Sequence, residues 1–284
     1  MIDSLSADFE HEIPNGSRLY FGKNAALKRK IENIASEILL KNDFNEILTP
    51  CFSYHQNLGV KSGLLKFSDP QNNEIALRAD STVDVVRIVR RRLKNENLKR
   101  WFYMQPIFKY PSKEFYQIGA EMIDERNLAL AIKIALEIFS EFGLKPVLQL
   151  SNIEIPKLIC QILGISIDVF EKGAIEVLLQ KDIKWLNDIT KATTLQDLKA
   201  LKNSVPSELK DAINDIENLG ISYENVRISL LYYSKMRYYD ELFFRFLDAN
   251  SILCSGGNYK IDGTNSSGFA VMVDAMIEKI IHKD

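Results

Sequence analysis

The chain has 284 residues, of which 46% are hydrophobic and 26% are charged. These values are typical of a globular protein and exclude the disordered and fibrous classes. The formal net charge is −2. Because a protein that binds mainly to a phosphate backbone needs a basic surface, a nucleic acid is not the expected partner. One local basic run extends from Arg87 to Arg100, and we interpret it as a solvated helix face.

The cysteines and the start of the chain restrict the class further. Cys51, Cys160 and Cys254 are far apart and form no Cys-x-x-Cys pair, so we expect no metal site, no cofactor and no disulfide framework. The segment Met1 to Glu10 is polar and acidic, unlike a secretory signal. No apolar run reaches the roughly 18 residues that a membrane helix requires. We therefore expect a cytoplasmic protein that does not span a membrane.

Apolar spacing predicts two helices and two short strands in the first third of the chain. The first helix places four apolar side chains on one face: Leu27, Ile31, Ile34 and Ile38. The second helix begins at Ser81, which together with Asp84 resembles a capping box. It points Val85, Val86, Val89 and Leu93 inward. The expected strands are Phe44–Leu48, which ends before Pro50, and Glu74–Arg78.

The segment from Trp101 to Ile123 is the most informative part of the sequence. It predicts two strands joined by a short turn at Tyr110-Pro111-Ser112. Gln117 and Glu121 are four residues apart, and because side chains alternate faces along a strand, both point to the same side. A carboxamide and a carboxylate among aromatic residues suit a ligand with an amine or an imidazole. A solvated strand face is the alternative interpretation of this pair.

The second half of the chain predicts a helical stretch between strands. Asn127 caps a helix that stops before Gly143, and residues 152–220 carry leucine and isoleucine at helical spacing. The other expected elements are strands at Val147–Leu150, Val226–Tyr233 and Tyr238–Leu247, a tight turn at Cys254–Tyr259 with Gly256 and Gly257 at positive φ, and a last helix that carries Val271, Met272, Ala275 and Ile280.

This order of elements predicts an α+β fold. Strands joined by hairpins dominate both ends of the chain, so the sheet should be mainly antiparallel and covered by helices on one side. We divide the chain into a first part of the core at residues 1–151, a mainly structural helical insertion at 152–222, and a last part of the core at 223–284.

Six short motifs occur in an order that resembles the catalytic core of class II aminoacyl-tRNA synthetases, and within that class the histidyl branch. They are Phe44–Pro50, similar to the first motif; Leu77–Thr82, similar to the histidyl substrate loop; Phe108–Glu121, similar to the second motif and the strand after it; the pair Tyr238-Tyr239; Gly256–Tyr259, similar to a Gly-Gly-Arg-Tyr turn; and Gly268–Ala270, similar to the start of the third motif. The resemblance covers nearly the whole chain and implies a class II synthetase-like antiparallel sheet flanked by helices.

The resemblance also implies a histidine-binding site. Asp80 and Thr82, assisted by Gln117, would hold the α-amino group. Glu121 and the tyrosine pair Tyr238-Tyr239, Tyr239 above all, would face the imidazole, which offers an N–H donor and an acceptor and titrates near neutral pH. None of these residues is expected to be catalytic.

The positions that grip ATP in the synthetases differ here. The Phe-Arg-x-Glu of the second motif reads Phe108–Pro111 with Lys109 in place of arginine, and the loop that follows is reduced to Ser112-Lys113. Ser234 stands where the histidyl family has an arginine, and the third-motif region Val271–Ala275 contains none. Arginine grips phosphate oxygens with a planar fork, and the loss of one such donor costs about 100- to 1000-fold in rate. We therefore expect no adenylation.

Two further features resemble the regulatory subunits of ATP phosphoribosyltransferase, a non-aminoacylating family related to histidyl-tRNA synthetase. Asp80 is one methylene shorter than the synthetase glutamate, and because the sequence ends at Asp284 we expect no anticodon-binding domain. The family implies a catalytic ATP phosphoribosyltransferase partner, histidine as effector, no tRNA, and a homodimer within a hetero-oligomer. By the same resemblance Phe44, Ile47 and Pro50 would lie at the dimer interface. Lys109 departs from this family too, which tends to keep Phe-Arg-Tyr-Glu-Arg.

Other interpretations stay open at this stage. A truncated ligase could activate histidine for an acceptor other than tRNA, although the missing arginines disfavour it. A scaffold with an idle pocket, kept for protein contacts, is a second alternative. Asp80 could simply cap the next helix, and one of the two paired tyrosines should belong to the core. The histidines show no partner spacing and are interpreted as surface residues: His11, His55 and His282.

Overall fold

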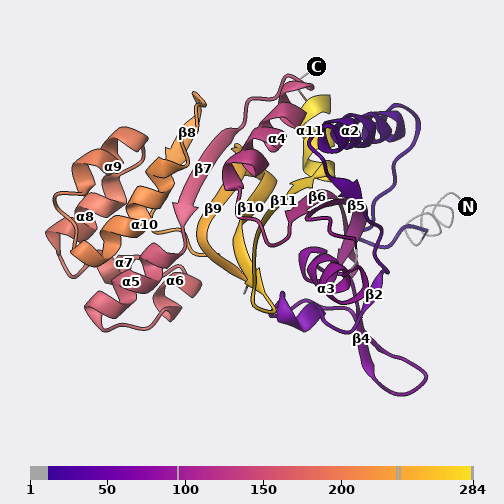
Figure 1. Ribbon diagram of the computed structural model, residues 1–284, viewed down its shortest axis with the longest axis horizontal. Coiled ribbons are helices and arrows are strands. Elements are labelled where there is room, and N and C mark those ends of the chain that lie inside the picture. Colours follow the sequence, from indigo (N-terminus) through magenta and orange to yellow (C-terminus); the bar gives the residue numbers. More distant parts are fainter. Residues whose placement is uncertain (1–11, 95, 235, 237, 283–284) are drawn as a thin grey trace, which may run out of the picture.

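The computed structural model describes residues 12–94, 96–234, 236 and 238–282 (Figure 1). The helices are α2 (Gly22–Lys41), the 3-10 helix η1 (Gln56–Leu58), α3 (Thr82–Arg92), α4 (Leu128–Ser140), α5 (Glu154–Leu163), α6 (Asp168–Glu171), α7 (Glu176–Leu179), α8 (Lys184–Lys191), α9 (Leu195–Leu201), α10 (Ser207–Asn218) and α11 (Val273–Ile281). The strands are β1 (Asn45–Glu46), β2 (Phe52–Ser53), β3 (Lys66–Ser68), β4 (Glu74–Leu77), β5 (Arg100–Lys109), β6 (Lys113–Met122), β7 (Val147–Asn152), β8 (Val226–Ile228), β9 (Tyr239–Asp248), β10 (Ser251–Ile261) and β11 (Thr264–Met272).

Within the described residues, the central sheet has eight strands in the order β1-β5-β6-β11-β10-β9-β7-β8. The pairs from β5 to β7 are antiparallel, and the edge pairs β1/β5 and β7/β8 are parallel. A second sheet consists of β2, β4 and β3. The mainly antiparallel sheet predicted from the sequence is therefore confirmed, and so is the hairpin, since Lys109 pairs with Lys113 around its turn.

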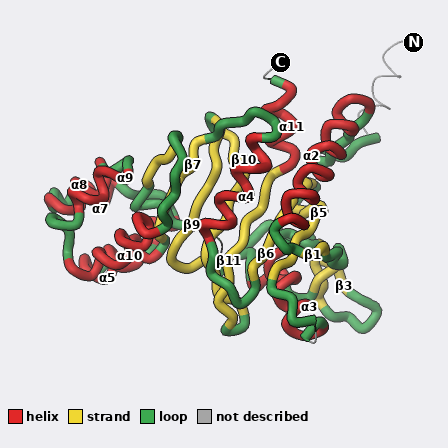
Figure 2. Tube along the Cα trace, turned by 45° about the horizontal axis from the view of Figure 1, so that its top comes forward, coloured by secondary structure: helices red, strands yellow, loops and turns green. Residues whose placement is uncertain are grey.

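Helices α2, α4 and α11 cover one face of the central sheet (Figures 1 and 2). On β6, Ile118, Ala120 and Met122 point to this face and are fully buried in its core. The opposite face is covered by α3 at one end only, where its valines pack with Trp101 and Tyr103 of β5. Alternation along β6 therefore directs Gln117 and Glu121 away from the main helical layer, toward the less covered face.

Helices α5 to α10 follow one another between β7 and β8, beside the far edge of the sheet (Figure 1). Their buried side chains, such as Ile155 of α5 and Ile213 of α10, belong to the same apolar core as Phe246 of β9. The side chain of Asn152 at the end of β7 also donates to the carbonyl of Ala212 at 3.0 Å. The predicted helical stretch is present, and it packs against the sheet as part of one continuous core.

The predicted tight turn at Cys254–Tyr259 is wrong, because this segment is the middle of β10. Gly256 and Gly257 are not needed there for a positive φ. A Cβ at Gly256 would lie 2.4 Å from the carbonyl oxygen of Gly268, and one at Gly257 would lie 2.9 Å from that of Leu242. Close approach of neighbouring strands, rather than a turn, requires these glycines.

Two helix starts also differ from the prediction. The last helix begins at Val273, so Val271 and Met272 lie in β11. Ser81 makes no capping hydrogen bond; its hydroxyl accepts from the Gln105 amide at 3.0 Å instead. Asp84 is turned away as well, because its carboxylate accepts from the Ser53 hydroxyl at 2.6 Å. Tertiary polar partners thus replace the expected capping box.

Candidate functional site

Small side chains in the middle of the central sheet create a hollow on the less covered face. In one row across the strands Glu121, Gly268, Gly257 and Phe243 are neighbours. In the next row Gly119, Ala270, Ser255 and Arg245 are neighbours. Of the small residues, Gly268, Ala270 and Ser255 line a cavity of about 410 Å³, within the roughly 300–1,000 Å³ of small-molecule sites.

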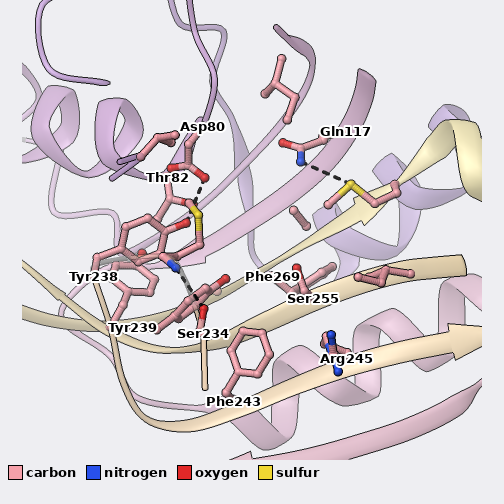
Figure 3. Close-up of a pocket in the computed structure, with 18 of the residues that line it drawn as sticks. Asp80, Thr82, Gln117, Ser234, Tyr238, Tyr239, Phe243, Arg245, Ser255 and Phe269 are labelled. Carbon is pink, nitrogen blue, oxygen red and sulfur yellow. Dashed lines mark hydrogen bonds between the residues drawn. The ribbon is translucent and has the colours of Figure 1, made fainter. Parts of the chain in front are cut away.

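All six residues predicted to bind histidine line this one cavity: Asp80, Thr82, Gln117, Glu121, Tyr238 and Tyr239. They come from the loop before α3, from α3 itself, from β6 and from the start of β9. Figure 3 shows Asp80 and Thr82 close to the paired tyrosines, with Gln117 farther along the wall. Residues more than 150 positions apart in the chain are thus brought together by the fold.

Glu121 is the most buried of these groups, with an exposed fraction of 1%. Its Oε1 accepts hydrogen bonds from Thr82 Oγ1 at 2.8 Å and from Tyr103 Oη at 3.3 Å, and its Oε2 accepts from Tyr259 Oη at 2.7 Å. No described Lys, Arg or His forms an ion pair with it. Desolvation by burial, only partly offset by these hydroxyl donors, raises the pKa of Glu121 to about 8. The alternative of a solvated strand face is therefore wrong for this residue.

Asp80 is held by partners on both sides. Its Oδ2 accepts from the Tyr238 hydroxyl at 2.9 Å, and its Oδ1 accepts a long hydrogen bond from the Val83 amide at 3.4 Å. The side chain of Gln56 fixes the backbone of Asp80, accepting from its N–H and donating to its carbonyl, both at 2.9 Å. Desolvation raises the pKa of Asp80 to about 6. Asp80 therefore contacts the start of the next helix and faces the cavity as well.

Gln117 and the paired tyrosines complete the predicted set. The Gln117 amide, which is also buried, donates to the sulfur of Met272 at 3.4 Å. The rings of Tyr238 and Tyr239 lie 4.8 Å apart, and both line the cavity. The expectation that one of them belongs to the core is confirmed, because Tyr238 is buried in the core around α3 and Tyr239, only partly buried, packs against that core. Burial raises the pKa of both phenols well above its usual value.

Sequence reasoning missed several residues of the cavity, of which Arg245 carries a charge. Arg245 stands in an otherwise apolar stretch of β9 and has the same strand parity as Tyr239 and Phe243. The available signal was a charged residue within the apolar run from Leu242 to Leu247. Phe243 and Ser255 line the same wall (Figure 3).

The segment predicted to form a dimer interface contains both buried and exposed side chains. Phe44 and Ile47 are buried in the core of the chain itself, with exposed fractions of 2% and 9%. Pro50 is exposed, and so are Leu48 and Phe52. If this segment forms an interface, Leu48, Pro50 and Phe52 are the side chains that it offers, rather than Phe44 and Ile47.

The remaining candidate residues do not form a site. No group of three or more His, Cys, Asp or Glu side chains in the described ranges is arranged to hold a metal ion. His11 lies outside the described residues, and His282 is exposed. His55 lies 3.5 Å from the guanidinium of Arg87, which itself pairs with Asp262 at 2.6 Å. The interpretation of the basic run as a solvated helix face is therefore wrong for Arg87, which is buried.

None of the described helices is long and apolar enough to cross a bilayer.

Comparison with known families matches residues 21–276 to the family model described as histidyl-tRNA synthetase. The ATP phosphoribosyltransferase regulatory subunit of Wolinella succinogenes is 43% identical, and the alignment covers 96% of each chain. That of Helicobacter hepaticus is 36% identical and covers 96% of this chain and 99% of the relative. This chain belongs to the histidyl-tRNA synthetase-like family of ATP phosphoribosyltransferase regulatory subunits.

A solved structure supports the fold of this regulatory-subunit family member. The protein from Bacillus halodurans described as an ATP phosphoribosyltransferase regulatory subunit/histidyl-tRNA synthetase superimposes with a TM-score of 0.83 at 20% identity, covering 96% of this chain and 83% of that chain. At this identity the likeness concerns the fold alone. The class II synthetase-like fold predicted from the motifs is thereby confirmed.

The positions that would grip a nucleotide in a synthetase contribute little fixed charge to the cavity of this family member. Lys109 and Ser234, which replace arginines, line it, and so does Met272 of the third motif. Ser234 uses its hydroxyl to accept from the backbone N–H of Met236 at 3.2 Å. Asp274 at the start of α11 accepts from the Tyr116 backbone at 2.7 Å. Three of the positions predicted to have lost their arginines therefore lie at the cavity and carry one flexible ammonium group.

Proposed function

We propose that this chain is a non-catalytic regulatory and activating subunit of ATP phosphoribosyltransferase, the first enzyme of histidine synthesis, and that it binds a catalytic subunit of the short form. Family membership supports this proposal, since the relatives that match over nearly the whole chain carry that name. The positions that correspond to the ATP-binding arginines of the synthetases carry few fixed cations here, and this supports a role without adenylation.

We further propose that the cavity binds histidine as the effector. The observation that carries the proposal is the convergence of six groups able to recognise histidine on one cavity. Asp80, ionised above its pKa of about 6, would pair with the α-amino group. Glu121 and Tyr239 would face the imidazole. A neutral imidazole needs one hydrogen-bond acceptor and one donor as partners, and a protonated imidazole needs two acceptors. The Glu121 carboxyl already has three hydroxyl donors, so its position is fixed before any ligand binds.

Regulation requires that the cavity and the partner surface influence each other. Tyr233, Ser234 and Met236 lie at the cavity and also at a neighbouring hollow that is lined by Lys157 of α5 and Glu171 of α6. A ligand that contacts these three residues would also act on the helices beyond β7. Coupling between two binding sites is reciprocal, so the catalytic partner should change the affinity for histidine by the same factor by which histidine changes the affinity for the partner.

Isothermal titration with L-histidine, with and without the catalytic subunit, tests this function. We expect binding to this chain and a different affinity in the complex. Asp80→Asn should weaken binding by about 10- to 100-fold, because a hydrogen bond to a charged group contributes about 1.5–3 kcal/mol. Asp211→Asn, which changes an exposed carboxylate of α10, is the matched control and should bind as the wild type does. Absence of heat up to millimolar histidine under both conditions would contradict the effector role.

The ligase alternative has its own readout. Histidine-dependent ATP–pyrophosphate exchange by the purified chain would favour a truncated synthetase-like enzyme over a regulatory subunit. We expect no exchange above the background of a sample without histidine, because three of the former phosphate positions carry only Lys109 as a cation.

We also propose a homodimer through the segment of residues 44–50 together with Phe52. Leu48 and Phe52, with exposed fractions of 73% and 57%, support this proposal, because an interface would remove their apolar side chains from water. Sedimentation analysis should show a dimer that dissociates in Leu48→Glu but persists in a variant of another exposed apolar residue, Ile162→Glu on α5. An unchanged dimer in Leu48→Glu would refute this interface.

A further inference from the structure

Arg245 is a cation of the cavity that has no acidic partner within the described part of the chain. Its guanidinium donates through Nε and Nη2 to Gln149 Oε1 at 2.9 and 2.5 Å and lies 4.1 Å from the ring of Tyr232. No described carboxylate forms an ion pair with it, and the Nη1 group has no protein partner among the described residues. One edge of the guanidinium is therefore fixed by Gln149 and one face by Tyr232, while the remaining nitrogen is free for a ligand.

The position of Arg245 relative to the acidic groups is set by the sheet. Figure 3 shows Asp80 and Thr82 on one side of the cavity and Arg245 with Ser255 on the other. Strands β10 and β11 separate β9 from β6, so the backbones that carry Arg245 and Glu121 are about 14 Å apart across the sheet. The cavity thus has an acidic side and a basic side.

The number of cations at the cavity, and how firmly each is held, indicate whether the cavity suits a triphosphate or a carboxylate. Lys109 is the other described cation at the cavity; it is exposed and its ammonium group lies 5.7 Å from the ring of Phe115, without an ion pair. A triphosphate needs several fixed donors, whereas a carboxylate can be held by one guanidinium nitrogen and a neighbouring hydroxyl. Ser255 supplies that hydroxyl, since it is the direct cross-strand neighbour of Arg245 and lines the same cavity.

We propose that Arg245 is the carboxylate anchor of the cavity, so that its ligand is a zwitterionic α-amino acid held at its amine by Asp80 and at its carboxylate by Arg245. This inference rests on the proposed histidine site and adds a residue and a ligand requirement to it. A free positive charge in a partly buried cavity favours an anion because its desolvation is otherwise uncompensated. An amine that carries an imidazole but no carboxylate would contact Asp80 and Glu121 and leave Arg245 without a ligand.

Titration of two ligands into four proteins tests the anchor. L-histidine and histamine, which lacks only the carboxylate, are titrated into the wild type, Arg245→Gln, Arg245→Lys and Arg227→Gln. Arg227 is an exposed arginine of β8 and provides the matched control. We expect Arg245→Gln to weaken histidine binding by about 10- to 100-fold, Arg245→Lys to weaken it less, and Arg227→Gln to leave it unchanged. Histamine should bind weakly and equally to all four proteins.

The possible outcomes separate this inference from the proposed function. Histidine binding to the wild type with no loss in Arg245→Gln would overturn the anchor and leave the histidine site standing. Equal losses for histidine and histamine would assign Arg245 a merely structural role and also overturn it. No histidine binding by the wild type would overturn both. If Arg245→Gln unfolds, Arg245→Lys decides: a loss confined to histidine supports the anchor, and no loss contradicts it.

Discussion

The burial of Glu121 leads to a quantitative prediction about stability and pH. The pKa of this carboxyl is raised from 4.5 to about 8 in the folded chain. Between these two values the unfolded chain has released the proton and the folded chain still binds it. The free energy of unfolding should therefore fall as pH rises through this range and level off above pH 8.

The size of this effect follows from one proton. A single proton bound only by the folded state changes the free energy of unfolding by about 1.4 kcal/mol per pH unit. Between pH 6 and 8 the wild type should thus lose about 2 kcal/mol through Glu121. Asp80 contributes little in this window because its pKa of about 6 lies at the lower end. Glu121→Gln, which keeps a neutral side chain of the same shape, should lack this loss.

Urea unfolding at a series of pH values from 6 to 9 measures the effect. Asp124→Asn is the matched control, since Asp124 follows the same strand but its side chain is 63% exposed. The control should keep the slope of the wild type, and Glu121→Gln should flatten it. A parallel slope in Glu121→Gln would refute the claim that burial holds this carboxyl protonated near neutral pH.

Three other substitutions test separate contacts. Gly268→Ala should lower the free energy of unfolding in urea by about 1–3 kcal/mol and abolish histidine binding. The added Cβ would lie 2.1 Å from Glu121 Oε2 and 2.7 Å from the Ala120 carbonyl oxygen. Unchanged stability would show that the strands can move apart to accept the methyl group. Tyr259→Phe removes the hydroxyl that makes the shortest hydrogen bond to Glu121. It should lower the free energy of unfolding by about 1–3 kcal/mol at pH 9, where the carboxylate is charged, and by less at pH 6. Equal losses at both pH values would contradict the assigned charge. Lys61→Met breaks an ion pair with Glu171 in which both side chains contact solvent, and it should lower the free energy of unfolding in urea by less than about 1 kcal/mol; a larger loss would mean that this pair holds α6 in place.

The sheet and the composition of the cavity could be predicted because they depend on local patterns and motif order. Strand alternation placed Gln117 and Glu121 on one face, and both line the cavity. The motifs that contain Asp80 and Tyr238 are far apart in the chain, and only the resemblance to the synthetases related them. Periodicity alone would not have shown that the Tyr238 hydroxyl donates to Asp80.

The errors have tertiary causes. The pair Gly256-Gly257 is a strong turn signal in isolation, but in the sheet these residues allow close packing against Gly268 and Leu242. Ser81 and Asp84 have the spacing of a capping box, and each is taken by a partner from another element. Arg245 was missed because its role depends on Gln149 and Tyr232, which come from other segments. In each case a contact distant in sequence overrides the local signal.

A crystal of the chain soaked with L-histidine and Mg-ATP together tests the central claim most directly. Histidine should be ordered in the cavity, with its amine at Asp80, its imidazole at Glu121 and Tyr239, and its carboxylate at Arg245, and no triphosphate should be ordered beside it. An ordered triphosphate gripped by the cavity, or a cavity that excludes histidine, would contradict the account.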